Sequence, residues 1–501
     1  MSKKMNQATN RSSSRDDIAR IDSNGNGKGH GNGLRNGRGH GEAVGNYGGA
    51  GNGNGVGHGD AARVPAGVGV RLGRLACRSC GGRNLELLLS LGRTPLANSL
   101  LKPEQLLDPE PRHRLELAFC QSCALLQITE AISPETLFRH YLYFSSVSST
   151  ILASARDLVD RLVRERGLDG SSLVVEIASN DGYLLRNYGR LGVPALGIEP
   201  ALNVAAAAEQ AGVRTLTEFF GAALAERLVA EGRRADVIHA NNVLAHVPDL
   251  NGFLHGIQRL LAPNGVAVIE VPYVRELIDR CEFDTIYHEH ICYFSLHALT
   301  RLAARHALVI ADVERIALHG GSLRLYIQHA HDSTAPSAAV GALLREEAIN
   351  RLDRIEYYRG FAARIASVRS DLLRLLRDLK ARGATIAAYG AAAKGSTLLN
   401  YCDIGRDLID FVVDRNPHKQ GLHMPGSHLP VYATERLLEK QPDYVLLLSW
   451  NFADEIMTQQ ADYLRRGGQF IVPVPVPRVV DGSDQIRDRR AGLTRGGRRM
   501  A

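Results

Sequence analysis

The sequence predicts an α/β protein in which a small cysteine-containing segment precedes two α/β domains. Three observations support this fold class. Strand-like apolar runs alternate with helical patterns from about residue 150 to 330, and the alternation returns after about residue 382. Two CxxC pairs come before the first alternating region. A chain of 501 residues is also too long for one core, and this length suggests about three domains.

The bulk composition disfavours several classes of protein. Hydrophobic residues make up 45% of the chain and charged residues 23%, as expected of a soluble globular enzyme. Apolar runs stay shorter than the roughly 18 residues that span a bilayer, and the N-terminus has no apolar signal region. We therefore expect a cytoplasmic protein without a membrane partner. Much of the net charge of +7 lies in the chain ends, as in RDRRAGLTRGGRRM, so nucleic acid is not an expected partner.

The first 70 residues are rich in Gly and Asn. We expect this head to be disordered, because it cannot bury enough apolar surface to offset its ordering entropy. His30, His40 and His58 recur in it, and they either bind a metal weakly or have no chemical role. The basic C-terminal end, 481–501, is also expected to be disordered.

Two cysteine pairs in the next segment indicate a structural metal site. A CxxC turn directs both sulfur atoms to one point, and two such turns supply the four thiolates of a tetrahedral zinc site. The expected ligands are Cys77, Cys80, Cys120 and Cys123. Four protein ligands leave no open position, so we expect no catalysis there; a redox CxxC and unpaired core cysteines are the alternatives. The other cysteines, Cys281, Cys292 and Cys402, are expected to be ordinary thiols.

The region from about residue 150 to 330 is expected to form a parallel sheet covered by helices on both faces. The first helix is TILASARDLVDRLVRERG, and the strand LVVEIAS follows it. The later strands are ALGIEP, DVIHAN and VAVIEVPY, separated by the helical segments NVAAAAEQAG and LNGFLHGIQRLLAPNG. After the helix FSLHALTRLAARH, two strand-like runs flank a Gly-Gly turn, which predicts an antiparallel hairpin at the sheet edge.

The first strand of this region ends in a turn that favours a cationic nucleoside cofactor. Glu176 lies within the strand, and the turn Ala178–Gly182 has a single glycine. A dinucleotide site would have GxGxxG there, because its backbone must approach a pyrophosphate. Glu199 ends the next strand, where an acidic residue takes both hydroxyls of a ribose. S-adenosyl-L-methionine, which has a positively charged amino acid end, fits this turn better than NAD does.

An amphipathic helical stretch, about 336–382, links this region to a second α/β pattern. The strand TIAAYG leads into the helix AAAKGSTLLNYC, and LIDFVVD, PDYVLLLS and QFIVPVP are further strands. Gly390, Gly395 and the start of the helix form either an anion site, to which Lys394 adds charge, or a plain tight turn. The loop is not a P-loop, because Ser396 directly follows Gly395.

The segments EIASNDGYLL, LGIEPA, NNVLAHVPD and YHEH together resemble the S-adenosyl-L-methionine-dependent C-methyltransferases of deoxysugar biosynthesis, which act on nucleotide-linked keto sugars. Members of that family have a zinc domain with paired CxxC motifs, a class I methyltransferase core and a Rossmann-like C-terminal domain with a YGAxAKG loop. All three parts match in order over about residues 75 to 475. We accordingly expect five parts, with the bounds 1–70, 71–145, 146–335, 336–480 and 481–501.

The resemblance also implies which residues bind the cofactor and the substrate. Those expected to line or border the cofactor are Glu176, Ala178, Asn180, Gly182, Glu199, Pro200, Asn242 and His246. Phe219 and Phe220 either flank the adenine or pack in the core. Those expected to help hold the nucleotide diphosphate of the sugar are Gly390, Lys394, Gly395 and Ser396. Tyr143 either reaches the active site or packs only at the interface between two domains.

The YHEH segment, Tyr287 to His290, is a metal site, an acid/base site or a packed polar run. Two histidines that flank one residue share a face only on a strand, and no third ligand is evident nearby in the sequence. The segment follows the strand VAVIEVPY, so it lies where open α/β folds bind ligands. We expect His290 to act as a base and Tyr287 as a hydroxyl donor. Glu289 either orients His290 or contacts the sugar, and His288 packs.

Methylation of a sugar carbon requires a base that removes a C–H proton beside a ketone, and donors that hold the resulting enolate. Other functions stay open: O- or N-methylation of another small molecule, a NAD-dependent sugar oxidoreductase, or a zinc-ribbon protein that binds nucleic acid. The missing GxGxxG disfavours the oxidoreductase, and only the CxxC pairs and the basic ends favour nucleic-acid binding.

Overall fold

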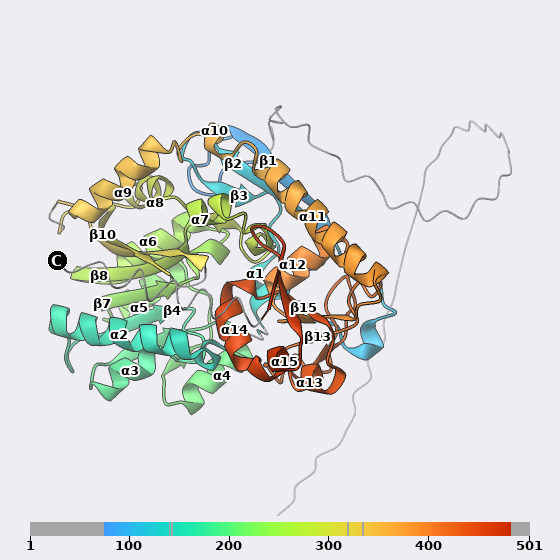
Figure 1. Ribbon diagram of the computed structural model, residues 1–501. Helices are drawn as coiled ribbons and strands as arrows, with labels where there is room; N and C mark the ends of the chain where they lie inside the picture. The colour runs from blue at the N-terminus through green and yellow to red at the C-terminus, as the bar shows by residue number, and fades with distance from the viewer. Residues whose placement is uncertain (1–74, 140, 142–143, 318–319, 333–334, 482–501) are drawn as a thin grey trace, which may run out of the picture. The chain divides into compact units, whose positions relative to one another are not determined.

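The computed structural model describes residues 75–139, 141, 144–317, 320–332 and 335–481, all within the unit Ala61–Ala501. The head 1–70, Tyr143 and residues 482–501 lie outside these ranges, so what we expected of them stays a prediction. The described strands form three sheets (Figure 1). None of the helices in the described ranges is long and apolar enough to cross a membrane.

The first sheet joins the cysteine segment to a later part of the chain. Its strands β1 (Leu85–Thr94), β2 (His113–Cys120) and β3 (Leu126–Ile128) pair antiparallel. The fourth strand, β9 (Cys292–Tyr293), follows the YHEH segment and pairs antiparallel with β3. This long-range pairing, which the sequence did not predict, fixes the chain after His290 against the cysteine segment.

The second sheet has seven strands in the order β10-β11-β8-β7-β4-β5-β6. The strands β8, β7, β4, β5 and β6 run parallel, and β11 pairs antiparallel with both β8 and β10. The predicted antiparallel hairpin at the sheet edge is therefore confirmed. The strand bounds are β4 (Val174–Ile177), β5 (Ala195–Ile198), β6 (Thr215–Leu216), β7 (Ala235–Asn241), β8 (Leu261–Pro272), β10 (Leu308–Ile316) and β11 (Ser322–His329).

Helices cover both faces of this sheet, because successive residues of a strand point to opposite sides. Val174 and Val237 pack with apolar residues of α2 and α3, whereas Val175 and Ile238 belong to the core that includes α5 and α6. The helix bounds are α2 (Ser149–Arg166), α3 (Leu185–Arg190), α4 (Leu202–Gln210), α5 (Ala222–Ala230), α6 (Leu250–Leu260), α7 (Val274–Asp279) and α8 (Leu296–Ala304).

The third sheet follows the order β14-β13-β12-β15-β16-β17 and is parallel except for β17. Its strands are β12 (Ile386–Tyr389), β13 (Val412–Val413), β14 (Val431–Tyr432), β15 (Tyr444–Leu447), β16 (Gln469–Val472) and β17 (Arg478–Val480). Its helices are α12 (Ala393–Cys402), α13 (Arg436–Lys440), α14 (Ala453–Gln459) and α15 (Ala461–Arg465). The second α/β pattern of the sequence is therefore confirmed.

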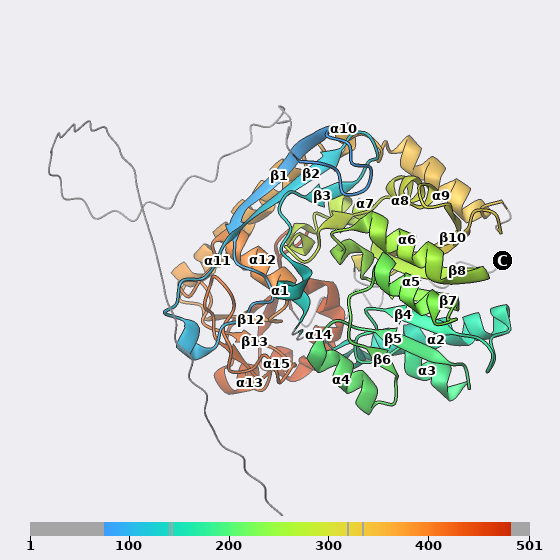
Figure 2. The same cartoon turned by 180° about the vertical axis from the view of Figure 1, so that it is seen from behind.

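The expected helical stretch between the two α/β regions is broken into three helices. These are α9 (Ala338–Ile349), α10 (Ile355–Tyr358) and α11 (Phe361–Ala381). Arg351 and Gly360, with φ of 59° and 85°, lie between them, and this left-handed backbone conformation ends a right-handed helix. The helix α11 packs beside β1 of the first sheet (Figure 2). The proposed five-part division with its residue bounds stays a prediction.

Candidate active site

A cavity of about 540 Å³ lies at the carboxyl ends of the parallel strands of the second sheet. Residues at or just after the ends of β4, β5, β7 and β8 line it. Its wall also includes Asn98 from the cysteine segment, and Lys394 and Lys419 from the region of the third sheet. Residues from three parts of the chain therefore meet at one cavity.

The turn after β4 adopts a conformation that most residues avoid. Ala178, Asn180 and Gly182 have φ of 53°, 50° and 73°. Position 182 requires glycine for two reasons: its φ is positive, and a Cβ added there would lie 2.7 Å from Val213 Cγ2. The side-chain oxygen of Asn180 accepts a hydrogen bond from the N–H of Ser145 at 2.8 Å. The turn places Ala178 and Asn180 on the cavity wall.

Glu199, just after β5, has a carboxylate held by two backbone amides. The N–H of Asn180 donates to Oε2 at 2.9 Å, and the N–H of Ala201 donates to Oε1 at 2.8 Å. Burial raises the pKa of Glu199 above its ordinary value, and the two amide bonds oppose this shift. Because the side chain lines the cavity, it presents a fixed acceptor to a ligand there.

Glu176 lies behind the cavity wall. It is 1% exposed, and its Oε2 has no hydrogen-bond partner among the described residues. Burial raises its pKa well above the ordinary range, and the neighbouring carboxylates of Glu199, Asp181 and Glu270 add to the shift. Gly182 also lies behind the wall. The residues predicted at the cofactor that do line the cavity are Ala178, Asn180, Glu199, Pro200, Asn242 and His246, together with Phe219 and Phe220.

His246 approaches the YHEH segment from the loop after β7. Its Nδ1 lies 2.7 Å from the carbonyl oxygen of Glu289, and its ring centroid lies 4.8 Å from that of His290. Burial lowers the pKa of His246, so the neutral ring is favoured. Asn242, with φ of 56°, starts this loop, and its N–H donates to the carbonyl of Glu270 at 2.8 Å.

His290 and Tyr287 form a pair on the cavity wall. The Tyr287 hydroxyl lies 2.9 Å from Nε2 of His290, and Nδ1 of His290 lies 2.9 Å from the carbonyl oxygen of Thr285. Since a carbonyl only accepts, Nδ1 of the neutral ring carries the proton and Nε2 accepts from the hydroxyl. Burial raises the pKa of Tyr287 well above its ordinary value, which keeps the hydroxyl protonated.

The other two residues of the segment contact the cysteine segment. The side-chain amide of Asn98 donates to both carboxylate oxygens of Glu289, at 2.9 and 2.7 Å. Burial raises the pKa of Glu289 to about 7. His288 is 1% exposed, and its Nε2 lies 3.2 Å from the carbonyl oxygen of Arg114. His288 is thus packed, while the expected role of Glu289 stays a prediction.

Two glycines, Gly390 directly after β12 and Gly395 in the first turn of α12, bring the backbone close to the end of β15. A Cβ added at Gly390 would overlap Ser449 Oγ, and one at Gly395 would lie 2.7 Å from Leu448 Cβ. Of the four residues predicted to bind the diphosphate, Lys394 lines the cavity. The other three, Gly390, Gly395 and Ser396, lie behind its wall.

Several residues on the wall were not anticipated from the sequence. Arg324 of β11 donates through Nε to Oε1 of Glu270 at 2.7 Å, and both side chains line the cavity. Lys419, which is 9% exposed, donates to the carbonyl of Ala391 at 2.8 Å, and burial lowers its pKa. Asn98, Glu282, Ser449, Asn451 and Phe452 are among the others. None of these residues belongs to a recognisable motif. The one sequence feature that could have indicated a wall residue is Arg324, which alternates with apolar residues in its strand.

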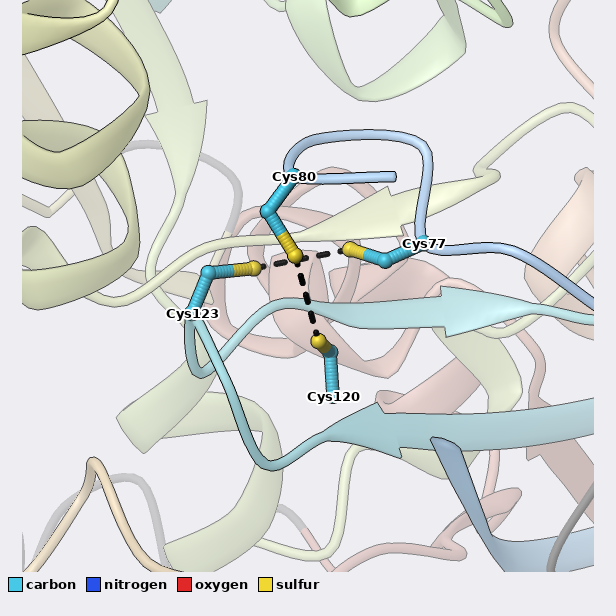
Figure 3. Close-up of side chains that lie close together, drawn as sticks. All are labelled: Cys77, Cys80, Cys120 and Cys123. Atoms are coloured by element: carbon cyan, nitrogen blue, oxygen red, sulfur yellow. Dashed lines mark hydrogen bonds between the residues drawn. The ribbon is translucent and has the colours of Figure 1, made fainter. Parts of the chain in front are cut away.

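The four cysteines of the two CxxC pairs converge (Figure 3). Their sulfur atoms lie within 4.8 Å of one another, with 3.4 Å between Cys77 and Cys123 and 3.6 Å between Cys80 and Cys120. Both pairs lie on tight turns: Gly81 N–H donates to the carbonyl of Cys77 at 2.9 Å, and Ala124 N–H to that of Cys120 at 2.8 Å. The cluster therefore offers four sulfur donors to one metal ion.

Three family models match successive parts of the chain: a zinc binding domain at residues 77–138, a methyltransferase domain at 148–312, and a C-methyltransferase C-terminal domain at 317–475. The C-methyltransferase NovU of Streptomyces niveus is 38% identical over 410 residues, which cover 82% of this chain and 98% of that protein. The chain belongs to the S-adenosyl-L-methionine-dependent C-methyltransferases. The expected methyltransferase activity and fold class, with a class I methyltransferase core, are thereby confirmed.

Two further proteins are similar to only part of this C-methyltransferase. A ubiquinone biosynthesis O-methyltransferase of Azorhizobium caulinodans is 33% identical over 121 residues, which cover 22% of this chain and 47% of that protein. The structure of magnesium protoporphyrin IX methyltransferase from Synechocystis PCC 6803 with bound SAM is 15% identical with a TM-score of 0.28, covering 35% of this chain and 78% of that chain.

Proposed function

We propose that this C-methyltransferase methylates a carbon of a nucleotide-linked keto-deoxysugar, with His290 as the base that forms the enolate. The observation that supports this most is the pair of His290 and Tyr287 on the cavity wall. Transfer to carbon requires a base that can take a C–H proton, and an imidazole with an accepting Nε2 suits that task near neutral pH.

The residues of the cavity fit S-adenosyl-L-methionine. Glu199 lines the wall at the end of β5, where an acidic residue takes ribose hydroxyls. Glu176, whose Oε2 has no partner among the described residues, lies behind this wall, and a positively charged ligand nearby would favour its ionised form. Ala178 and Asn180 would hold the amino acid end of the cofactor, with His246 near the substrate. When bound, the cofactor supplies a methyl group on a positively charged sulfur.

In the proposed mechanism, Nε2 of His290 takes the proton from the carbon beside the ketone. The carbonyl of Thr285 holds Nδ1–H, which orients the ring and stabilises the imidazolium that forms. Tyr287 stays protonated and donates to the ketone oxygen as it becomes an enolate. In the unliganded site its hydroxyl donates to Nε2, so the arriving ketone oxygen replaces Nε2 as acceptor and frees the base.

The nucleotide-linked substrate is supported by the C-terminal region. That region adds Lys419 and Lys394 to the cavity wall. Both lysines lie far along the sequence from the residues proposed to bind the cofactor. Lys419 is nearly buried, and a buried ammonium group favours an anionic ligand because the pair then loses less to desolvation. A diphosphate between nucleoside and sugar supplies such an anion.

We also propose that the four cysteines hold a structural zinc ion. A tetrahedral site with Zn–S bonds of about 2.3 Å places its sulfur atoms about 3.8 Å apart. Two of the sulfur separations, 3.4 and 3.6 Å, are close to that value, and all four sulfur atoms lie within 4.8 Å of one another. Three of the four cysteines are buried, and four sulfur ligands leave no open position for substrate.

Deuterium exchange separates the base step from methyl transfer. The protein is incubated in D₂O with S-adenosylhomocysteine and a panel of nucleotide-linked keto sugars, and exchange beside the ketone is followed by mass spectrometry. We expect exchange with the wild-type protein and a loss of about 10²–10⁴-fold with His290→Asn. Tyr287→Phe is expected to slow exchange too, while both variants still bind S-adenosylhomocysteine.

A labelled cofactor then tests the substrate class. Transfer of its methyl group to a carbon of one member of the panel is the expected result. Full turnover by His290→Asn would contradict the base assignment. Methylation of a small molecule without a nucleotide, with no transfer to any nucleotide-linked keto sugar, would contradict the proposed substrate.

A further inference from the structure

Three ionisable side chains with unsatisfied atoms lie at one corner of the cavity, two on its wall and one directly behind it. Glu282 and Asp284 lie at the 3₁₀ turn Phe283–Thr285, and Lys394 lies in the first turn of α12, which packs against it. Glu282 is 4% exposed and Asp284 is fully buried. Among the described residues, Glu282 Oε1, Asp284 Oδ1 and Lys394 Nζ have no hydrogen-bond partner. Glu282 and Lys394 line the cavity.

Trp450 and Gly320 lie beside these groups. The indole N–H of Trp450 donates to Oδ2 of Asp284 at 2.6 Å, and Lys394 Nζ lies 5.2 Å from the centroid of the Trp450 ring. A Cβ added at Gly320 would lie 2.7 Å from Oε2 of Glu282, so the backbone of the hairpin closes the other side. The carboxylate of Glu282 and the ammonium of Lys394 thus attract each other without a direct hydrogen bond.

Buried charged groups without partners are costly, so a ligand that supplies both an acceptor and a donor gains affinity here. With one ammonium group and two carboxyl groups, whose pKa values burial raises to about 7 for Glu282 and about 6 for Asp284, the corner has no excess of positive charge for an anion. A phosphate approaching Lys394 would face Glu282 and Asp284, and like charges repel. A hydroxyl group, in contrast, donates to Glu282 Oε1 and accepts from Lys394 Nζ at the same time.

We propose that Glu282 and Lys394 form a subsite for a hydroxyl group of a sugar ring in the substrate, with Asp284 excluding phosphate from it. The proposal rests on the proposed nucleotide-sugar substrate and deepens it. It also changes the role expected for Lys394, which then recognises a hydroxyl, while Lys419 remains the cation for the diphosphate. The ring is either the ribose of the nucleoside or the hexose, since both offer the same chemistry.

Calorimetric titration of the full-length protein with S-adenosylhomocysteine present tests this subsite. The probes are inorganic pyrophosphate, uridine diphosphate, its 3′-deoxy analogue and uridine diphosphate glucose, with the thymidine series in parallel. The variants are Glu282→Gln and Lys394→Met. The control is Lys380→Met, which removes an ammonium group on α11 that pairs with Asp410 at 3.5 Å.

We expect both variants to bind at least one hydroxyl-bearing nucleotide about 10-fold or more weakly, because each leaves a hydrogen bond to the hydroxyl unmade. Pyrophosphate affinity is expected to stay unchanged, as is all binding by Lys380→Met. A loss with uridine diphosphate that vanishes for the 3′-deoxy analogue identifies the ribose. A loss confined to the glucose conjugate identifies the hexose.

Two results would overturn the subsite alone: equal weakening of pyrophosphate and nucleotides by Lys394→Met, which indicates a phosphate site, or nucleotide binding unchanged in both variants. If the wild-type protein binds none of the nucleotides in either series, the proposed nucleotide-linked substrate fails together with the subsite.

Discussion

Individual side chains of the site are oriented by backbone groups from other parts of the chain. The carbonyl of Thr285 selects the tautomer of His290, and the amides of Asn180 and Ala201 hold the carboxylate of Glu199. The sequence named His290 and Glu199 as candidates from their residue types and positions. Their hydrogen-bond partners are backbone atoms, which every residue possesses. No pattern of residue types can therefore predict which residues supply them.

Gly182→Ala is expected to destabilise the protein and weaken binding of S-adenosylhomocysteine. The added Cβ meets Val213 at 2.7 Å in a backbone conformation with φ of 73°. We expect a loss of about 2–3 kcal/mol, from overpacking and from backbone strain. Denaturant unfolding and calorimetric titration measure both effects.

The matched control is Gly192→Ala. Gly192 has a similar φ of 75°, but a Cβ there has nothing within 4 Å. Its loss is expected to be about 1 kcal/mol from backbone strain alone. If the two variants lose equal stability, contact with Val213 is not the reason for glycine at position 182.

Glu289→Gln is expected to change the pH dependence of stability. The pKa of Glu289 is raised to about 7 by burial, so the folded protein binds the proton more tightly than the unfolded chain does. Stability from this group is therefore present below the unfolded pKa of about 4.5 and is lost as the pH rises toward 7. Because glutamine cannot ionise, the variant does not lose stability at this position as the pH rises.

We expect the unfolding free energy of Glu289→Gln, relative to wild type, to rise by about 3 kcal/mol between pH 4.5 and 8, since one pKa unit corresponds to about 1.4 kcal/mol. Denaturant unfolding at several pH values measures this. Glu104→Gln, at an exposed glutamate, is the control. A constant difference between Glu289→Gln and wild type across this range would contradict the raised pKa.

Among the secondary-structure elements, β9 connects the cysteine cluster to His290, the proposed base. The strand β3 begins three positions after Cys123 and pairs with β9, which begins two positions after His290. The N–H of Ile128 also donates to the carbonyl of Ile291 at 3.0 Å. Because the metal would fix the turn before β3, it would indirectly fix the position of the YHEH segment.

Removal of the proposed zinc with a chelator is therefore expected to loosen residues 286–293. We expect their amide hydrogen exchange to accelerate, whereas exchange in β4 and β5 changes little and S-adenosylhomocysteine still binds. Cys123→Ser is expected to act in the same direction, because it removes one of four ligands. Cys402→Ser, at a buried cysteine outside the cluster, is the control. Unchanged exchange at 286–293 after metal loss would contradict this coupling.

Considered as a whole, the molecule forms its cavity only where residues from three regions come together. The cysteine segment contributes Asn98, the second sheet contributes Glu199 and His290, and the region of the third sheet contributes Lys394 and Lys419. The indole N–H of Trp450 donates to the buried carboxylate of Asp284, which links the C-terminal region to the segment that contains His290.

Trp450→Phe is expected to weaken this link. The variant leaves Oδ2 of Asp284 buried without its donor, which costs about 1–3 kcal/mol of stability. Asp284→Asn and the double variant complete a thermodynamic cycle, measured by denaturant unfolding. We expect a clear coupling energy between the two positions, with S-adenosylhomocysteine binding retained. Additive losses would show that the two side chains do not interact.

The sequence by itself determined the fold class, the order of the three matching regions, the four converging cysteines and a turn after β4 whose residues Ala178 and Asn180 line the cavity. These features are local: alternating apolar runs, paired CxxC motifs and a glycine turn after a strand follow from neighbouring residues. The break of the linking helix at Arg351 was not visible, because a left-handed residue other than glycine has no sequence signature.

Only the tertiary structure decided which residues share the cavity. It placed Asn98 on Glu289, left Glu176 and Ser396 behind the wall, and brought Lys419 onto it. It also set Glu282 beside Lys394, more than 100 positions apart in the chain. Burial, and with it the pKa of each carboxylate, depends on packing between distant segments, and no short stretch of sequence contains that information.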